Sequence, residues 1–170
     1  MRILIIVIGG FAMLIVCVVA IGSLLPQKHV ASRSASFRAA PEKLFSLIAG
    51  PQSWRPDVLR DESVPDTNGR ELRRETARNG ETITYELLDR KPPQSITRRI
   101  ATENLPYSGS WTTALQPQGE TTTVRITETG QVYNPVFRFV SRFVIGHTRT
   151  IDTYLRALGK ANGQEIEIGS

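Results

Sequence analysis

The chain has 170 residues and a net charge of +5, with two histidines and one cysteine. Because Cys17 lies in an apolar run, the rest of the chain has no disulfide, and two histidines without further cysteines argue against a structural zinc site. The basic side chains form no dense run and do not alternate with aromatic ones, which argues against a nucleic-acid partner. We expect no metal and no cofactor, since dinucleotide, phosphate-loop and nucleophile-elbow motifs are absent from the sequence.

Residues 3–25 contain no charged side chain. As a helix rising about 1.5 Å per residue, this run is long enough for a hydrocarbon core of about 30 Å. The sequence therefore predicts one N-terminal transmembrane helix in residues 1–25, a single-pass anchor in the plasma (inner) membrane, and a linker at 26–29. A cleaved signal peptide is the alternative, but its apolar region is usually only about 7–15 residues long. The flanking basic residues leave the side of the membrane open, and anionic headgroups are the expected neighbours of a tethered basic domain.

One domain of ordinary size follows, which we place at 30–161, with a flexible tail at 162–170. The alternation of small and polar residues at 30–38 predicts a strand. A helix then begins near Pro41, a favoured first helical position, and ends before Gly50-Pro51. We expect a second short helical turn at 52–55.

Period-two patterns separated by Gly, Pro, Asn and Asp predict a run of strands after this turn. Asn79-Gly80 is a strong hairpin signal, because both residues tolerate a positive φ. Short turns of this kind indicate an antiparallel meander. The expected strands are 58–64, 70–78, 82–89, 95–103, 110–117 and 121–132.

The last element is predicted as one long amphipathic helix over 135–160, with apolar residues at steps of three and four. Gly146 is expected to destabilise the middle of this helix by about 1 kcal/mol relative to alanine. The fold class is therefore α+β, with a curved antiparallel sheet of about seven strands wrapped on a long C-terminal helix. The apolar stripe of this last helix, at steps of three and four, consists of Phe137, Val140, Val144, Thr148, Ile151, Leu155 and Leu158.

This order of elements resembles the START/polyketide-cyclase (SRPBCC) superfamily, the helix-grip fold that also contains the pollen-allergen proteins. The resemblance covers residues 29–160, and each block is loose. It implies a cavity between sheet and helix for an apolar ligand such as a lipid, sterol or polyketide, and it carries no universal catalytic signature. The blocks are Ala40-Pro41-Glu42-Lys43-Leu44-Phe45, Trp54-Arg55-Pro56-Asp57-Val58, Gly109-Ser110-Trp111-Thr112, Thr127-Glu128-Thr129-Gly130 before Asn134-Pro135, and Tyr154-Leu155-Arg156-Ala157-Leu158.

Two side chains are candidates for acid-base chemistry. His147 flanks the apolar stripe of the last helix, and Glu128 shares its strand face with apolar neighbours. A buried carboxylate needs a partner, so we expect a structural pair of Glu128 with an arginine, for which Arg98 has the right strand face. Such a pair would also serve to bind the polar end of a ligand. The expected cavity residues are Trp54, Tyr85, Arg98, Ile100, Trp111, Ile126, Glu128, Val140, Val144, His147 and Ile151.

Three functions fit these patterns. The first is membrane-tethered binding or transfer of a hydrophobic small molecule, lipid, isoprenoid or polyketide-like. The second is a cyclase, dehydratase or hydrolase acting on such a molecule, with His147 or Glu128 as general acid or base. The third is an interaction module with a filled core. Cavity volume separates the third from the other two, and the oligomeric state is not predicted.

Overall fold

A single antiparallel sheet of eight strands forms most of the molecule, in the spatial order β2-β3-β4-β5-β6-β7-β1-β8. The computed structural model describes residues 2–169. The strands are β1 (Lys28–Phe37), β2 (Val58–Val64), β3 (Leu72–Ala77), β4 (Thr82–Lys91), β5 (Ser95–Ile100), β6 (Tyr107–Gln118), β7 (Thr121–Val132) and β8 (Ile168–Gly169). The helices are α1 (Arg2–Leu24), α2 (Pro41–Ala49), the 3-10 turn η1 (Gln52–Trp54), α3 (Pro135–Val140), the π-helical turn η2 (Ser141–Ile145) and α4 (Arg149–Ala161).

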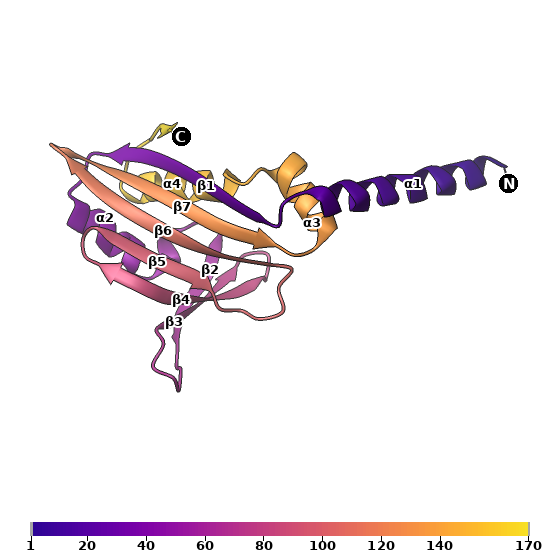
Figure 1. Ribbon diagram of the computed structural model, residues 1–170. Coiled ribbons are helices and arrows are strands. Elements are labelled where there is room, and N and C mark those ends of the chain that lie inside the picture. Colours follow the sequence, from indigo (N-terminus) through magenta and orange to yellow (C-terminus); the bar gives the residue numbers. More distant parts are fainter. Residues whose placement is uncertain (1, 170) are drawn as a thin grey trace.

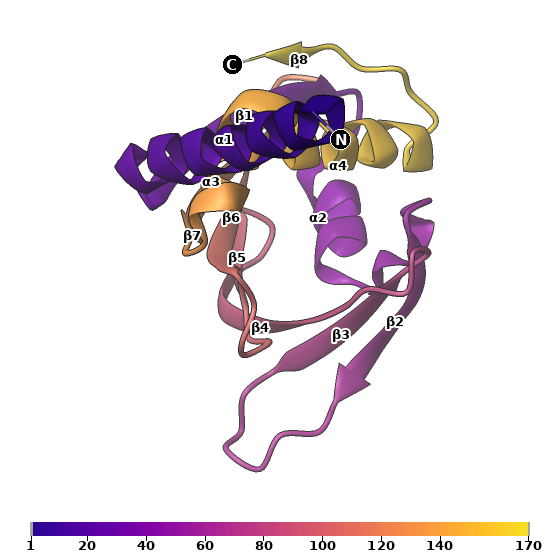
Figure 2. The same cartoon turned by 90° about the vertical axis from the view of Figure 1, so that its right-hand side faces the viewer.

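The sheet curves around α2 and α4, which lie on its concave side (Figures 1 and 2). Strands β2 to β7 follow one another as a meander, and β1 completes the sheet beside β7. Register irregularities between Val58 and Arg60 and between Leu87 and Asp89 mark β-bulges, which increase local twist and bending. The predicted α+β helix-grip fold is confirmed.

The hydrophobic core fills the half of this concavity that lies far from α1. The side chains of Phe37, Leu44, Ile48, Leu155 and Leu158 are almost completely buried there. Each such burial stabilises the fold by about 1.5–3 kcal/mol relative to exposure. The halves of the strands nearer α1 are not covered by these core side chains, and the candidate site lies against them.

The C-terminal helix is not continuous, so the prediction of one helix over 135–160 is wrong. The helix is interrupted after Ile145, because Gly146 has φ 80° and ψ 146°, a conformation that L-residues avoid. The first piece, α3, is capped by the Asn134 side chain, which accepts hydrogen bonds from the backbone N–H groups of Val136 and Phe137. The sequence pattern does not reveal this interruption, because apolar residues recur at steps of three and four on both sides of Gly146.

The C-terminal tail returns to the sheet. Ile168 and Gly169 form β8 against Ala35 and Ser34, although the sequence suggests a flexible tail. The Gln164 side chain also donates to the Arg38 carbonyl at 2.9 Å and accepts from the Arg38 N–H at 2.9 Å. A strand of two residues is too short to show alternation in the sequence. Its pairing depends on the free edge of β1.

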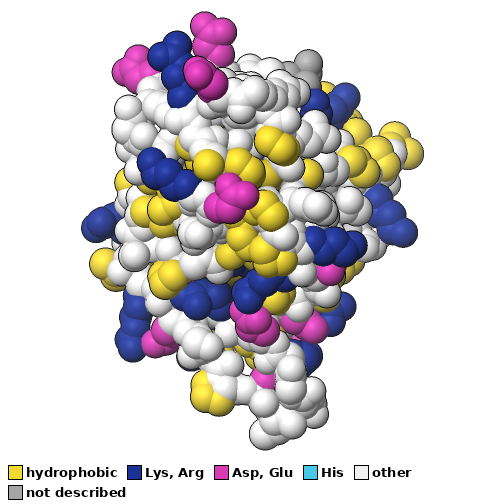
Figure 3. Space-filling model, turned by 90° about the vertical axis from the view of Figure 1, so that its left-hand side faces the viewer, with side chains coloured by type: hydrophobic (Ala, Val, Ile, Leu, Met, Phe, Trp, Pro, Cys, Tyr) yellow, Lys and Arg dark blue, Asp and Glu magenta, His cyan; other side chains and the backbone are white. Residues whose placement is uncertain are grey.

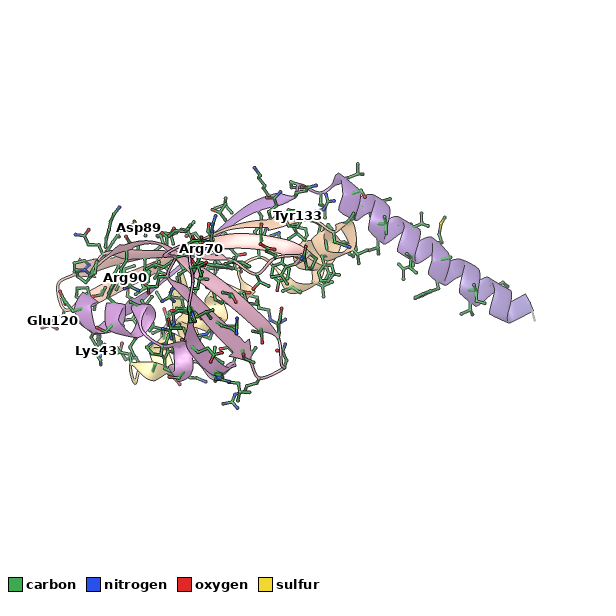
Figure 4. The ribbon with its side chains drawn as sticks, turned by 90° about the horizontal axis from the view of Figure 1, so that it is seen from below. Lys43, Arg70, Asp89, Arg90, Glu120 and Tyr133 are labelled. Carbon is green, nitrogen blue, oxygen red and sulfur yellow. The ribbon has the colours of Figure 1, made fainter. Side chains whose placement is uncertain are left out.

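Helix α1 projects from one end of the domain, and α3 lies at its base (Figure 1). Residues Ile6–Leu24 are long and apolar enough to cross a membrane, a property that signal sequences share. Only 6% of that stretch is buried, so α1 is not a core helix. Tyr133 lies at the α1 end of the domain, whereas Lys43 and Glu120 lie at the far end (Figure 4).

Candidate functional site

Between the α1-end halves of the strands and the C-terminal helices lies a cavity with two connected chambers. The inner chamber, of about 410 Å³, lies between the sheet and the elements α2, η1 and α4. The outer chamber, of about 580 Å³, lies beside α3 and η2 at the α1 end. Both volumes fall within the range of about 300–1,000 Å³ that is typical of small-molecule sites. The chambers share Arg55, Asp57, Glu75, Tyr85, Trp111, Ile145 and Thr150 in their walls.

The inner chamber combines an isoleucine-rich wall with a polar end. Tyr154 donates a hydrogen bond from its hydroxyl to Gln52 Oε1 at 3.2 Å, and Gln52 Nε2 donates to the Ile48 carbonyl at 3.1 Å. Burial raises the pKa of Tyr154 to about 12, so the phenol stays protonated. The apolar wall is made by Ile48, Ile96, Ile126 and Ile151.

An ionic cluster lies at the junction of the chambers. Arg55 binds Glu75 through Nη1 at 2.9 Å and Asp57 through Nη2 at 2.5 Å, and its guanidinium carbon lies 5.4 Å from the centre of the Tyr154 ring. Burial raises the pKa of Glu75. Burial is the largest single influence on the Asp57 carboxyl and acts to raise its pKa, but the hydrogen bond and the charge of Arg55, with a backbone hydrogen bond, together lower that pKa. The cluster is a fixed polar group in an otherwise apolar wall.

Tyr85 and Trp111 form an aromatic corner that borders both chambers. Their rings meet edge to face, with centroids 6.0 Å apart. Among the residues that the structure describes, no hydrogen-bond partner is found for the Tyr85 hydroxyl. Burial raises the pKa of this phenol, so it remains a neutral donor that faces the cavity. A ligand oxygen placed here would satisfy it.

The outer chamber contains a carboxylate–imidazole cluster. Glu128 accepts a hydrogen bond from Trp111 Nε1 at 2.9 Å, and its other oxygen lies 3.2 Å from His29 Nε2. The His29 and His147 rings are stacked, with centroids 4.0 Å apart. The cluster joins β1, β6 and β7 to the interruption before α4.

The expected pair of Glu128 with Arg98 is wrong. The two residues lie on β7 and β5, and Trp111 of β6 stands in register between them. Arg98 instead donates from Nη2 to the Ala49 carbonyl at 3.1 Å, which ties β5 to the end of α2. Both side chains lie on inward strand faces, as the alternation predicts, but the Trp111 indole between them takes the place of the arginine at Glu128.

His147 lies in the short segment between Gly146 and α4 and borders the outer chamber. Burial, followed by the neighbouring His29 and Arg142, lowers the pKa of its imidazole from the usual value of 6.5. Near neutral pH the ring is therefore uncharged. No hydrogen-bond partner for it is found in residues 2–169.

Most of the predicted cavity residues do border the two chambers. Trp54 is different, since it donates from Nε1 to the Leu47 carbonyl at 3.0 Å and packs edge-on against Tyr154. Val144 is also different, because its side chain is 69% exposed on η2. The π-helical turn causes the second discrepancy, since it rotates Val144 out of the stripe that a continuous α-helix would have. The predicted residues that border the cavity are Tyr85, Arg98, Ile100, Trp111, Ile126, Glu128, Val140, His147 and Ile151.

Sequence reasoning missed several wall residues. Arg55 and Asp57 stood in one of the blocks that carried the resemblance, yet their charges gave no indication of a place inside a cavity. Glu75 could have been found from its position on an alternating strand, because it shares a face with Ala77. His29 was expected in the linker at 26–29, but it belongs to β1, and its pairing opposite Gly130, two residues after Glu128 on β7, brings it to the site.

Within residues 2–169 no group of three or more His, Cys, Asp or Glu side chains is arranged to hold a metal ion. The side chains of the cavity can enclose apolar groups, hydrogen-bond a polar end and present a neutral imidazole.

Several solved structures are similar to this architecture. A search of curated proteins found no match to the chain. Norcoclaurine synthase from Thalictrum flavum has 12% identity and a TM-score of 0.60, with 78% of this chain and 85% of that one covered. Protein MLL2253 from Mesorhizobium loti has 15% identity and a TM-score of 0.58, covering 78% and 96% of the chains. Ara h 8.0201 has 14% identity and a TM-score of 0.57, covering 81% and 99%.

At these identities the structural matches establish the fold alone. The family model for polyketide cyclase/dehydrase and lipid transport proteins matches residues 28–161, which is most of the chain and includes every strand of the meander and α4. The chain therefore belongs to the polyketide cyclase/dehydrase and lipid transport family.

Proposed function

We propose that the protein binds a hydrophobic small molecule with a polar end group and that α1 tethers it to a membrane. The observation that supports this proposal most strongly is the two-chambered cavity, whose apolar walls surround a few fixed polar groups. That is the usual composition of a small-molecule site. The apolar part of the ligand would fill the chambers, and its polar end would lie at the junction near Tyr85 and Arg55.

The family supports a ligand of this class, since its description includes both polyketide chemistry and lipid transport. One structure of Thalictrum flavum norcoclaurine synthase, which is similar to this chain in fold, contains dopamine and hydroxybenzaldehyde. The family description favours a lipid or polyketide-like ligand here, and the norcoclaurine synthase structure is an example of small organic molecules bound by a protein of this fold.

A membrane tether suits such a ligand. Molecules with long apolar parts partition into bilayers, so a binding domain gains access to them by staying at the surface. Helix α1, with its uninterrupted apolar run, would be a single-pass anchor in the plasma (inner) membrane. The basic charge of the chain suits anionic headgroups.

Acid-base catalysis is the second candidate function. One observation favours it: the neutral His147 imidazole faces the outer chamber and is stacked on His29, which contacts Glu128. Such a ring can take up a proton near neutral pH as a general base and return it in a later step. Glu128 would then orient His29 and would not itself react, because Trp111 and His29 already occupy its oxygens.

Native mass spectrometry of the full chain, extracted from host membranes in detergent, tests the binding function. We expect a stoichiometric copurified lipid or isoprenoid. Replacing Thr150 with tryptophan places a large ring at the junction of the chambers, because Thr150 borders both. Ala161→Trp adds the same ring to the exposed end of α4 and serves as the matched control.

The binding function predicts that Thr150→Trp loses the ligand and that Ala161→Trp retains it. An empty wild-type protein that also takes up no hydrophobic dye would contradict the proposal. If the wild type returns a chemically altered ligand, and His147→Gln returns it unaltered, the catalytic candidate is correct instead.

A further inference from the structure

We propose that the segment from Val136 to Ile145, here called the apolar lip, inserts into the surface of a lipid bilayer beside α1 and opens the outer chamber toward the lipid. This inference rests on the proposed function, because it requires α1 as a membrane anchor and the cavity as a site for a hydrophobic ligand. The partner is the headgroup and upper acyl region of the bilayer itself.

The apolar lip exposes large hydrophobic side chains on the surface of the domain. The exposed fractions are 40% for Val136, 50% for Phe137, 59% for Phe143, 69% for Val144 and 49% for Ile145. Several large exposed hydrophobic side chains on one short segment are typical of a contact with a partner or a membrane. The face opposite α1 differs, since charged side chains of both signs are spread among its hydrophobic ones (Figure 3).

The apolar lip is attached to the end of α1. Arg138 is buried, and its Nη1 donates to the Leu25 carbonyl at 2.8 Å and to the Ser23 carbonyl at 3.4 Å. Gly22 packs so closely on Pro135 that an added Cβ would overlap the Pro135 carbonyl oxygen. The last turn of α1 and the first turn of α3 therefore lie side by side, as Figure 1 also shows. If α1 spans a membrane, the apolar lip lies at its surface.

The charges around the apolar lip match a bilayer with anionic lipids. Between Thr129 and Ile151 the sequence has no acidic residue, while Arg142 and Arg149 are exposed. Glu81 borders the outer chamber from the turn between β3 and β4, where it accepts a hydrogen bond from Tyr107, and Glu103 follows β5. An apolar surface flanked by arginines is the pattern of interfacial helices that lie in the headgroup region.

The same segment is a wall of the cavity. Phe137, Val140, Ser141 and Ile145 border the outer chamber, so the apolar lip separates the chamber from the proposed bilayer surface. The π-helical turn and Gly146 interrupt the helix at this wall, where a continuous α-helix would be stiffer. A ligand that leaves the bilayer beside the apolar lip would enter the chamber without crossing water.

Depth-dependent quenching in nanodiscs of phosphatidylcholine and phosphatidylglycerol tests the inference on the full chain. An environment-sensitive fluorophore is attached to Phe143→Cys or Val144→Cys in a Cys17→Ser background, with doxyl-labelled phospholipids as quenchers. Leu88→Cys, on the exposed face of β4, is the matched control. The wild-type chain labelled at Cys17 reports on α1 separately.

We expect several-fold stronger quenching by doxyl lipids at positions 143 and 144 than at 88. Quenching at 143 and 144 by aqueous iodide alone would overturn the inference, and so would protection from both quenchers, which indicates a protein partner. In either case strong lipid quenching at Cys17 together with a copurified ligand would leave the proposed function intact.

A transfer assay tests the consequence for ligand uptake. Val144→Asp should slow the uptake of a pyrene-labelled fatty acid from vesicles several-fold, whereas Leu88→Asp should not. Unchanged uptake in Val144→Asp would overturn the role of the apolar lip in loading. No uptake by the wild type would count against the proposed function and not against membrane contact.

Discussion

The Tyr85 hydroxyl is the polar atom best placed to recognise a ligand, because it borders both chambers and has no partner among the described residues. Removing it with Tyr85→Phe should weaken ligand binding about five- to tenfold, the usual effect of one neutral hydrogen bond of about 1 kcal/mol. Stability should be unchanged, since no protein contact is lost. Ligand competition measured by native mass spectrometry checks the change in affinity.

Tyr133→Phe is the control for this substitution. The Tyr133 hydroxyl lies 2.8 Å from that of Ser108, and the residue is exposed at the α1 end (Figure 4). Its loss should leave ligand affinity unchanged. Equal affinities for Tyr85→Phe and the wild type would show that the ligand does not use this hydroxyl.

His147 should make stability depend on pH. Because burial, His29 and Arg142 lower the pKa of His147 in the folded state, the unfolded chain takes up a proton at this position at higher pH. Stability present above the usual pKa of about 6.5 is therefore lost as the pH falls through the lowered pKa. Urea unfolding between about pH 7.5 and pH 5.5 should show this loss.

The loss should be smaller in His147→Gln, which has no titrating ring at this position. If the pH dependence of the variant equals that of the wild type, His147 is not the group responsible. Carboxyl groups, including Glu75, whose pKa is raised by burial, are the same in both proteins and therefore cancel in the comparison.

At the scale of elements, Gly146 determines that the C-terminal segment forms two helices. Its φ of 80° with ψ of 146° is open essentially to glycine alone, so Gly146→Ala should destabilise the domain by about 1–3 kcal/mol. Urea unfolding measures this cost. A stable alanine variant with a continuous helix would contradict the structure described here.

Gly119 provides a matched comparison, because its φ of 61° is the ordinary left-handed value of a turn between β6 and β7. Asparagine is tolerated in that conformation. Gly119→Asn should therefore cost less than about 1 kcal/mol, whereas Gly146→Asn should cost as much as Gly146→Ala. Similar costs at both sites would mean that the interruption at Gly146 is not the source of the strain.

For the whole molecule, the buried Arg138 holds α1 against the domain. Its guanidinium satisfies carbonyl groups that are left free at the end of α1, where a positive charge is also favoured by the helix dipole. Arg138→Met keeps the length of the side chain but removes these donors. We expect cleavage after the exposed Lys28 by a lysine-specific protease to become at least about tenfold faster, because a charged hydrogen bond is worth about 1.5–3 kcal/mol.

Arg142→Met makes the same change on the neighbouring turn, where the arginine is exposed, and should leave the cleavage rate unaltered. Protein in detergent micelles suffices for this comparison. If Arg138→Met is cleaved no faster than the wild type, α1 is held by the packing of Gly22 on Pro135 alone.

Sequence reasoning recovered the parts of the molecule that local patterns control. The strands β2 and β7 have the predicted bounds of 58–64 and 121–132, because alternation and flanking turns define them locally. The apolar α1 and the Pro41 start of α2 are local features of the same kind. Most of the predicted cavity residues follow from them, since alternate residues of a curved sheet face its concave side.

Tertiary structure decided what depends on neighbours that are distant in the sequence. Glu128 binds Trp111 and His29 rather than Arg98, because the order of strands in the sheet places an indole between the two charges. The β8 pairing depends on the free edge of β1. The partition of the concave face into a filled core and an open cavity depends on where α2 and α4 end, and no periodicity records that. By itself the sequence determined the order of elements, the family resemblance and the apolar N-terminal helix, because these are local or additive properties. The site exists only in the folded chain, because its residues come from seven strands and five helical segments and meet through long-range packing.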